Sequence, residues 1–145
     1  MSLVAELRHA TSLDLPRINT FLEQASLPTA GVESCLENFV IASDKDGVMV
    51  GVAGFELCGH SCLIRSVAVD DRLRRQGLGR SLVNAVLRNA KAKGVQKAYL
   101  LTETAAPFFE RLGFRPINRN IVHKAVKAST EFTELCPESA TAMFK

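Results

Sequence analysis

The segment RRQGLGRS, residues 74–81, places two glycines among three arginines where an apolar run gives way to a helical pattern. Glycine lets the backbone adopt conformations and close approaches that a side chain would block. The N–H groups of Gln76 to Arg80 have no partner inside the helix that they begin, and they lie at the positive end of its dipole. Phosphate oxygens fit such a site. The segment predicts an anion-binding loop, and the alternative is a plain strand-to-helix turn.

The spacing excludes two common phosphate loops. No Gly-Lys-Ser/Thr sequence follows, so this is not a Walker loop, and Gly79 lacks the third glycine of a dinucleotide fingerprint three residues later. Arg72, Arg75 and Arg80 are candidates for further phosphate contacts, because the planar guanidinium matches phosphate oxygens. A solvated role for one or two of them is the alternative.

The bulk composition is that of one globular domain spanning residues 1–145, with 47% hydrophobic and 23% charged residues. The net charge is only +3, and one Tyr without any Trp offers few stacking groups. We therefore expect a small anionic ligand and no nucleic acid. No apolar run approaches the roughly 18 residues of a membrane span, and the start lacks a signal-peptide pattern. We expect a cytoplasmic protein.

Four cysteines, Cys35, Cys58, Cys62 and Cys136, raise the question of a metal site. The spacing in CGHSC, residues 58–62, resembles no standard zinc pair, and no second Cys/His pair follows. We expect no metal, and we interpret the thiols as buried structural side chains.

The apolar periodicity predicts an α/β fold on a mixed sheet. Turns at Asp46-Gly47 and Gly59-His60-Ser61 make the second to fourth strands an antiparallel meander. A helix between the fourth and fifth strands makes that pair parallel through a right-handed crossover. Strands are expected at about 4–10, 38–43, 48–58, 62–69, 95–101, 114–117 and 139–145, and helices from 15, over 32–36, from 78 to about 93, over 107–112 and over 122–135.

Two motifs carry a family resemblance. Arg74-x-x-Gly77-x-Gly79, entered from SVAVDD, resembles the acetyl-CoA loop of the GNAT family of N-acetyltransferases, whose motif reads Gln/Arg-x-x-Gly-x-Gly/Ala. LTETAAPFFERLGF, residues 101–114, resembles the fifth strand and fourth helix of that fold. The order of elements matches from about residue 4 to 145. The resemblance implies a GNAT fold: a mixed sheet of about seven strands flanked by helices, with the strands at 62–69 and 95–101 splayed apart.

The resemblance also implies a binding mode for acetyl-CoA as the co-substrate. Its pyrophosphate is expected on the N–H groups of Gln76 to Arg80, and its pantetheine arm along the backbone of Val67 and Val69. The Val67 amide is the expected oxyanion donor, a contribution of roughly 10² to 10³ in rate. The expected cofactor contacts are Val67, Ala68, Val69, Arg74, Arg75, Gln76, Gly77, Leu78, Gly79, Arg80, Ser81 and Phe108.

The chain departs from the family pattern at the general acid. Many GNAT enzymes carry a Tyr in the fourth helix that protonates the departing thiolate, and Phe109 stands at that position here. The one tyrosine, Tyr99, falls on a strand. The thiolate is expected to leave unassisted or to take its proton from water. The base is open among Glu103, Glu56 and His60, and Glu103 is nearest the expected wedge.

Arg65 and Ser66 interrupt an otherwise apolar strand just before the expected oxyanion donor. A buried charge is costly unless it is paired. Arg65 is a candidate clamp for a substrate carboxylate, and the alternative is an internal ion pair with Glu56 or Glu103. Strand alternation places Arg65 and Ser66 on opposite faces, so that at most one lines the pocket. The predicted catalytic groups are Val67, Glu103 and Ser66, and the predicted substrate contacts are Arg65, Ser66 and Glu103.

A narrower resemblance lies in the C-terminal third. FFERLGFRPINRN and ELCPESATAMFK resemble the acetyltransferases grouped with arsenic-resistance operons, the ArsN-like proteins, and those of the N-acetylglutamate synthase type. This implies acetylation of a small-molecule amine, either an amino acid or an amino-acid-like toxin of the arsinothricin or phosphinothricin type. The alternatives are a protein or peptide N-acetyltransferase and a non-catalytic acyl-CoA sensor. The last strand would lie near a sheet edge, which makes a homodimer an open expectation.

Overall fold

The computed structural model describes residues 6–73, 76–118 and 140–145. The predicted helix at 122–135 lies outside these residues. The strands are β1 Glu6–His9, β2 Val40–Ser43, β3 Met49–Cys58, β4 Ser61–Val69, β5 Lys97–Thr102, β6 Arg115–Pro116 and β7 Thr141–Phe144. The α-helices are α1 Leu15–Gln24, α2 Leu78–Ala92 and α3 Ala106–Arg111, and short 3-10 turns cover Ser12–Asp14, Glu33–Asn38 and Asp71–Leu73. No helix in the described ranges is long and apolar enough to cross a membrane.

The strands form one mixed sheet in the order β1-β2-β3-β4-β5-β7-β6. The turn at Asp44–Gly47 joins β2 to β3 because Gly47 adopts φ +80° and donates its N–H to the Asp44 carbonyl at 3.0 Å. β4 and β5 are parallel, with α2 as the crossover between them. The predicted α/β fold is confirmed, including the meander and the crossover.

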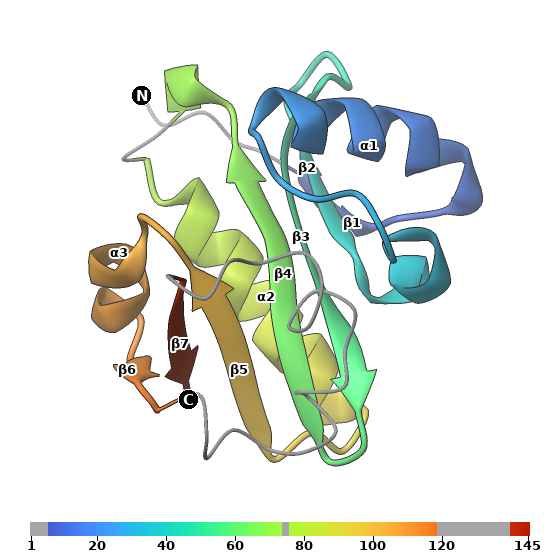
Figure 1. The fold of residues 1–145 in the computed structure, drawn as a ribbon. Helices are drawn as coiled ribbons and strands as arrows, with labels where there is room; N and C mark the ends of the chain where they lie inside the picture. Colours follow the sequence, from blue (N-terminus) through green and yellow to red (C-terminus); the bar gives the residue numbers. More distant parts are fainter. Residues whose placement is uncertain (1–5, 74–75, 119–139) are drawn as a thin grey trace.

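Helices cover both faces of the sheet (Figure 1). On one face, Ile18 and Leu22 of α1 pack against Ile41 and Val52. On the other face, the apolar stripe of α2 packs against β2, β3 and β4, and α3 adds Phe109 to the same core. Burial of these stripes holds the helices to the sheet, because each removed Å² of apolar surface contributes about 25 cal/mol.

β4 and β5 pair only over their first halves. The register runs from Ser61 opposite Lys97 to Ile64 opposite Leu100, and no pair follows in the described residues. β4 nevertheless continues to Val69, where it pairs with β3 alone. The expected splay of these two strands is therefore confirmed, and within the described residues no strand pairs with the β5-facing edge of residues 65–69.

A β-bulge interrupts β4 at the point where the strands separate. Gly54 of β3 pairs with Arg65, and Val52 pairs with Ala68, so two residues of β4 oppose one residue of β3. Ser66 has φ +61°, a left-handed conformation that costs a non-glycine residue about 1–3 kcal/mol. The bulge turns the following backbone away from a regular ladder.

Asp14 stands at the N-cap of α1, but its side chain does not cap that helix. Its carboxylate accepts hydrogen bonds from both terminal nitrogens of Arg8 at 2.8 Å and from the Thr11 N–H at 2.8 Å. These donors hold the pKa of Asp14 well below its usual range, with Arg8 as the largest cause. The carboxylate therefore joins β1 to the start of α1.

Candidate active site

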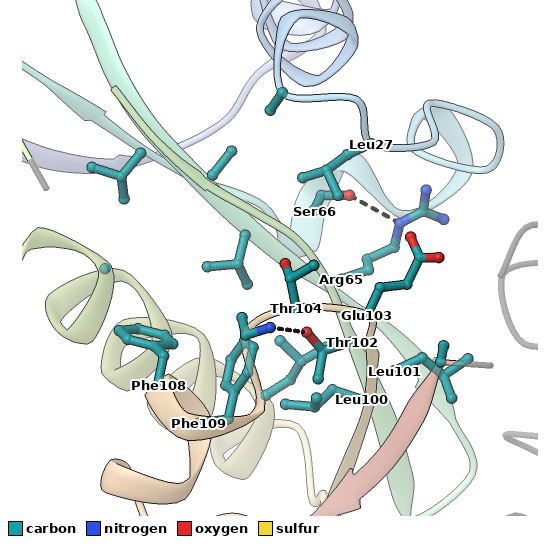
Figure 2. A pocket seen from close by; sticks show the side chains of 18 of the residues that line it. Leu27, Arg65, Ser66, Leu100, Leu101, Thr102, Glu103, Thr104, Phe108 and Phe109 are labelled. Atoms are coloured by element: carbon teal, nitrogen blue, oxygen red, sulfur yellow. Dashed lines mark hydrogen bonds between the residues drawn. The ribbon is translucent and has the colours of Figure 1, made fainter. Parts of the chain in front are cut away.

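A pocket of about 1050 Å³ opens where β4 and β5 separate. Its walls come from the bulged half of β4, the end of β5, the start of α3 and the segment that follows α1. Figure 2 shows Arg65 and Ser66 on one side of it and Thr102 to Thr104 on the other. The pocket brings together eight predicted site residues: Arg65, Ser66, Val67, Ala68, Val69, Gly79, Glu103 and Phe108.

The N-terminus of α2 lies beside this pocket. Gly77 is the N-cap residue with φ +81°, and no side chain of the described ranges caps the helix. Gly79 reaches the pocket wall, where an added Cβ would stand 3.1 Å from Cζ of Phe108. The two positions therefore favour glycine for different reasons. Gly77 requires a positive φ, and Gly79 leaves room for the close approach of Phe108 in α3.

The other predicted residues of the anion loop lie outside the pocket wall. Arg74 and Arg75 are outside the described residues. Gln76, Arg80 and Ser81 are exposed, and Leu78 is buried in the core. The hydroxyl of Ser81 donates to the Gly77 carbonyl at 3.1 Å. The backbone N–H groups at the start of α2 are the groups of this loop that can bind an anion. The roles of the individual loop residues stay predictions.

Arg72 is engaged by a neighbouring carboxylate. Its Nε and Nη2 each lie 3.1 Å from an oxygen of Asp70, and its backbone N–H also donates to Asp70. These hydrogen bonds lower the pKa of Asp70. The Arg72 side chain is 77% exposed, so a phosphate would have to compete with this pair in water.

The Arg65 side chain is completely buried. Its Nε donates to Oγ of Ser66 at 3.1 Å, and its Nη2 donates to the Pro28 carbonyl at 3.4 Å. Its Nη1 lies 3.7 Å from Oε2 of Glu56, and neither of these two atoms has a hydrogen-bond partner among the described residues. The predicted internal ion pair with Glu56 is present, while the carboxylate clamp stays a prediction.

The prediction that alternation separates Arg65 and Ser66 is wrong. Both residues line the pocket, and their side chains are hydrogen-bonded to each other. The physical reason is the positive φ of Ser66, which breaks the two-residue repeat of the strand. Figure 2 shows the two side chains meeting on one side of the strand.

The three candidate bases fall in different environments. Glu103 follows β5, is exposed and lines the pocket. Glu56 lies behind Arg65 with an 18% exposed side chain, and it is absent from the pocket wall. His60 is exposed in the turn between β3 and β4. Glu103 is therefore the candidate with direct access to the pocket.

Phe109 cannot replace a tyrosine acid, because its ring carries no proton donor and is buried. It packs edge-on against Phe108 at 5.0 Å and against Phe114 at 5.7 Å between ring centroids. Tyr99 is buried on β5, stacked on Phe144. Neither ring supplies an acid to the pocket.

Several pocket residues escaped the sequence analysis. Arg111 of α3 adds an exposed cation to the wall, and Thr102 and Thr104 add hydroxyls. The Thr102 hydroxyl accepts the Ala105 N–H at 3.0 Å and so shapes the start of α3 (Figure 2). Residues 25–28, which follow α1, form another wall. Of these residues, only Arg111 could have been singled out from the sequence, because it is a basic residue within the family-like motif at residues 101–114.

The cysteines in the described residues are buried. Burial raises the pKa of Cys58 to about 11 and that of Cys62 to about 12, so both thiols stay protonated near neutral pH. Cys136 lies outside the described residues. Among the residues that the structure describes, no group of His, Cys, Asp and Glu side chains is placed to hold a metal ion.

Comparison with known proteins gives the class. A family model described as an acetyltransferase (GNAT) domain matches residues 36–116. The chain therefore belongs to the GNAT acetyltransferase family. A curated relative, glucosamine 6-phosphate N-acetyltransferase of Trypanosoma brucei brucei, is 36% identical over 69 residues, 47% of this chain and 45% of that protein. The chain spans about half the length of the curated relatives it matches.

Solved structures share the fold. Rv2747 from Mycobacterium tuberculosis, solved with CoA, has a TM-score of 0.80 at 23% identity over 96% of this chain and 97% of that chain. N-acetylglutamate synthase from Neisseria gonorrhoeae, solved with coenzyme A and N-acetyl-glutamate, has a TM-score of 0.82 at 18% identity over 100% of this chain and 35% of that chain. Both of those structures contain coenzyme A.

Proposed function

We propose that the protein is an acetyl-CoA-dependent N-acetyltransferase for a small primary amine. The observation that carries this proposal is the wedge between β4 and β5. Its pocket is lined along β4 by residues 65–69, whose β5-facing edge pairs with no strand in the part of the chain that the structure describes, and by Gly79 at the start of α2. An extended pantetheine arm can pair with such an edge as an added strand does. The pyrophosphate would then meet the uncapped N-terminus of α2.

The proposed reaction is direct transfer. The amine nitrogen attacks the thioester carbonyl carbon, the C–N bond forms, and the carbonyl oxygen takes negative charge beside the Val67 N–H. The C–S bond then breaks, and its electron pair leaves on the CoA sulfur. The proton lost by the amine goes to Glu103, directly or through one water, because Glu103 is the exposed carboxylate of the pocket. The thiolate takes its proton from water.

The proposed acceptor is an amino acid or an amino-acid-like toxin. The pocket wall carries charges of both signs, with Glu103 and Arg111 both exposed. A zwitterionic acceptor offers a matching pair of charges. The structural similarity to N-acetylglutamate synthase is in keeping with this class. The finer resemblance to arsenic-resistance acetyltransferases stays a prediction, as do the cytoplasmic location and the homodimer.

An acceptor screen tests the proposed function. Purified protein and acetyl-CoA are incubated with amino acids, phosphinic and arsinic amino acids, amino sugars, polyamines, aminoglycosides and short peptides. Thiol release is followed, and the product is identified by mass. We expect thiol release and an N-acetylated product with an amino-acid-like amine. Release with peptides alone would favour a peptide acetyltransferase, and no release with any amine would favour a non-catalytic acyl-CoA sensor.

A further inference from the structure

The Arg65 guanidinium joins three parts of the chain around the pocket. It donates to Ser66 of the β4 bulge and to the Pro28 carbonyl after α1, and it lies 3.7 Å from Glu56 of β3. Gly31 completes the enclosure, because an added Cβ there would stand 3.0 Å from Nη1 of Arg65. The side chain is completely buried in this arrangement. The contacts of this buried guanidinium are therefore with other groups of the protein.

The contact with Ser66 bears on catalysis through the next residue. Ser66 keeps its left-handed conformation only where its surroundings hold it. The hydrogen bond from Arg65 Nε to its hydroxyl, at 3.1 Å, is one such constraint. The bulge in turn aims the backbone of Val67, the proposed oxyanion donor. A small displacement of such a donor is costly, since misplacement by about 1 Å can lower a rate roughly 100-fold.

The contact with Pro28 bears on the opposite wall. Residues 25–28 line the pocket, and this segment also carries a left-handed residue, Ser26, with φ +59°. The bond from Arg65 Nη2 therefore ties that wall to β4. Glu56 supplies the compensating charge that a buried guanidinium requires.

We propose that Arg65 is a positioning residue that fixes the Ser66–Val67 bulge relative to the wall formed by residues 25–28. It does so without contacting the acceptor. This inference rests on the proposed function for its catalytic part. It competes with the carboxylate clamp, and the two roles differ in what each variant should change.

The kinetic test uses a matched acceptor pair, the best amino acid from the screen and derivatives in which each carboxylate is replaced by a carboxamide. In Arg65→Lys, a positioning role lowers kcat by about 10- to 100-fold for every acceptor, because the same oxyanion donor serves all of them. The ratio of kcat/KM between the paired acceptors stays within about 2-fold of wild type. A clamp predicts the reverse: normal kcat with the carboxamide and a selective loss with the carboxylate, and that result would overturn the proposal.

Ser66→Gly provides a second variant that tolerates the positive φ. It removes the hydroxyl that accepts from Arg65 while the glycine keeps the bulge accessible. We expect it to lower kcat for both acceptors in the same proportion. The kcat of the double variant Arg65→Lys/Ser66→Gly should be no more than about 2-fold below that of the less active single variant. The effects of residues that act as one unit are not additive. Multiplied effects contradict the proposal.

Amide hydrogen exchange gives a readout that needs no turnover. In the ligand-free protein, Arg65→Lys should raise exchange at the amides of Ser26 and Leu27 by about 10-fold, because these N–H groups donate to the carbonyls of Glu23 and Leu22 and local opening of the wall exposes them. Exchange at the centre of α2 serves as the internal control. Unchanged exchange at Ser26 and Leu27 overturns the positioning role even if wild type acetylates amines. A wild-type protein with no turnover but with the expected exchange pattern overturns the proposed function and leaves the positioning role standing.

Discussion

Ile64 and Leu100 are the last residues that pair β4 with β5. Both side chains are buried, so this pair forms a closed apolar floor. Above it, β4 turns through the bulge at Ser66 and β5 ends at Thr102. The pocket, the unpartnered strand edge and the start of α2 all meet above this floor.

Gly77 and Gly94 form a matched pair at the two ends of α2. Both have positive φ, +81° and +88°, and an added Cβ would meet nothing within 4 Å at either position. Alanine should therefore cost about 1–2 kcal/mol of strain at each. Gly77→Ala should also raise the KM for acetyl-CoA by about 10-fold, because relief of the strain shifts the N–H groups that receive the pyrophosphate.

Steady-state kinetics with varied acetyl-CoA checks this, with urea unfolding to confirm that the two variants lose similar stability. Gly94→Ala should leave KM unchanged. Equal KM values for the two variants would show that the N-terminus of α2 does not bind the pyrophosphate.

Glu103 and Glu110 form a second matched pair. Both are exposed, but only Glu103 lines the pocket. Glu103→Gln removes the proposed proton acceptor and should lower kcat by about 100-fold, within the usual range for general base catalysis. Glu110→Gln should stay within about 2-fold of wild type, as expected for a side chain outside the site. Initial rates at saturating acetyl-CoA decide, and a Glu103→Gln variant with wild-type kcat would leave proton removal to solvent.

Asp14 should give the protein a measurable acid sensitivity. Hydrogen bonds from Arg8 and from the Thr11 N–H hold its folded-state pKa below the unfolded value of about 3.9. The charged pair therefore stabilises the fold above about pH 4, and this contribution is lost as the pH falls through the folded-state pKa. Asp14→Asn should lower the free energy of unfolding by about 1.5–3 kcal/mol at neutral pH, typical of hydrogen bonds to a charged group.

Urea titrations of wild type and variant at about pH 7, 4 and 2.5 measure the difference. We expect it to shrink steadily below about pH 4. Asp46→Asn, in the exposed turn before β3, serves as the control and should stay within about 0.5 kcal/mol of wild type throughout. A difference that does not change with pH would show that the Asp14 charge contributes nothing.

Cys58 and Cys62 should resist thiol reagents in the folded protein. Burial is the main cause that raises their pKa values to about 11 and about 12, with the Glu56 charge also acting on Cys58. At neutral pH, fewer than about one thiol in 10³ would be the reactive thiolate. Alkylation followed by peptide mass spectrometry should find both cysteines unmodified until denaturant is added. Rapid labelling in buffer would show that the β3–β4 hairpin opens readily.

Most of the fold was predictable because its signals are local. The turn at Asp46-Gly47 and the apolar stripe of α2 each specify one conformation through their own chemistry. The separation of β4 from β5 came from the family resemblance, since no residue pattern marks the end of a strand pairing. The structure confirmed it at Ile64 and Leu100.

The site was less predictable because it depends on an irregular backbone. A glycine at the bulge would indicate a positive φ from the sequence alone. Ser66 adopts a positive φ, and a serine gives no such indication. Alternation then assigns Arg65 and Ser66 to the wrong relative faces. Of the two partners of the buried guanidinium, Glu56 was one of two carboxylates that the sequence offered, whereas Pro28 lies 37 residues away and only the folded arrangement identifies it.

The most direct test of the central claim is a backbone amide NMR titration of the protein with coenzyme A. The account predicts that the largest shift changes fall on the amides of residues 65–69 and 77–80, at the open edge of β4 and the start of α2. Residues at the far end of the sheet, such as Ser61 and Lys97, should change little. Absence of binding, or shifts centred away from these two segments, would contradict it.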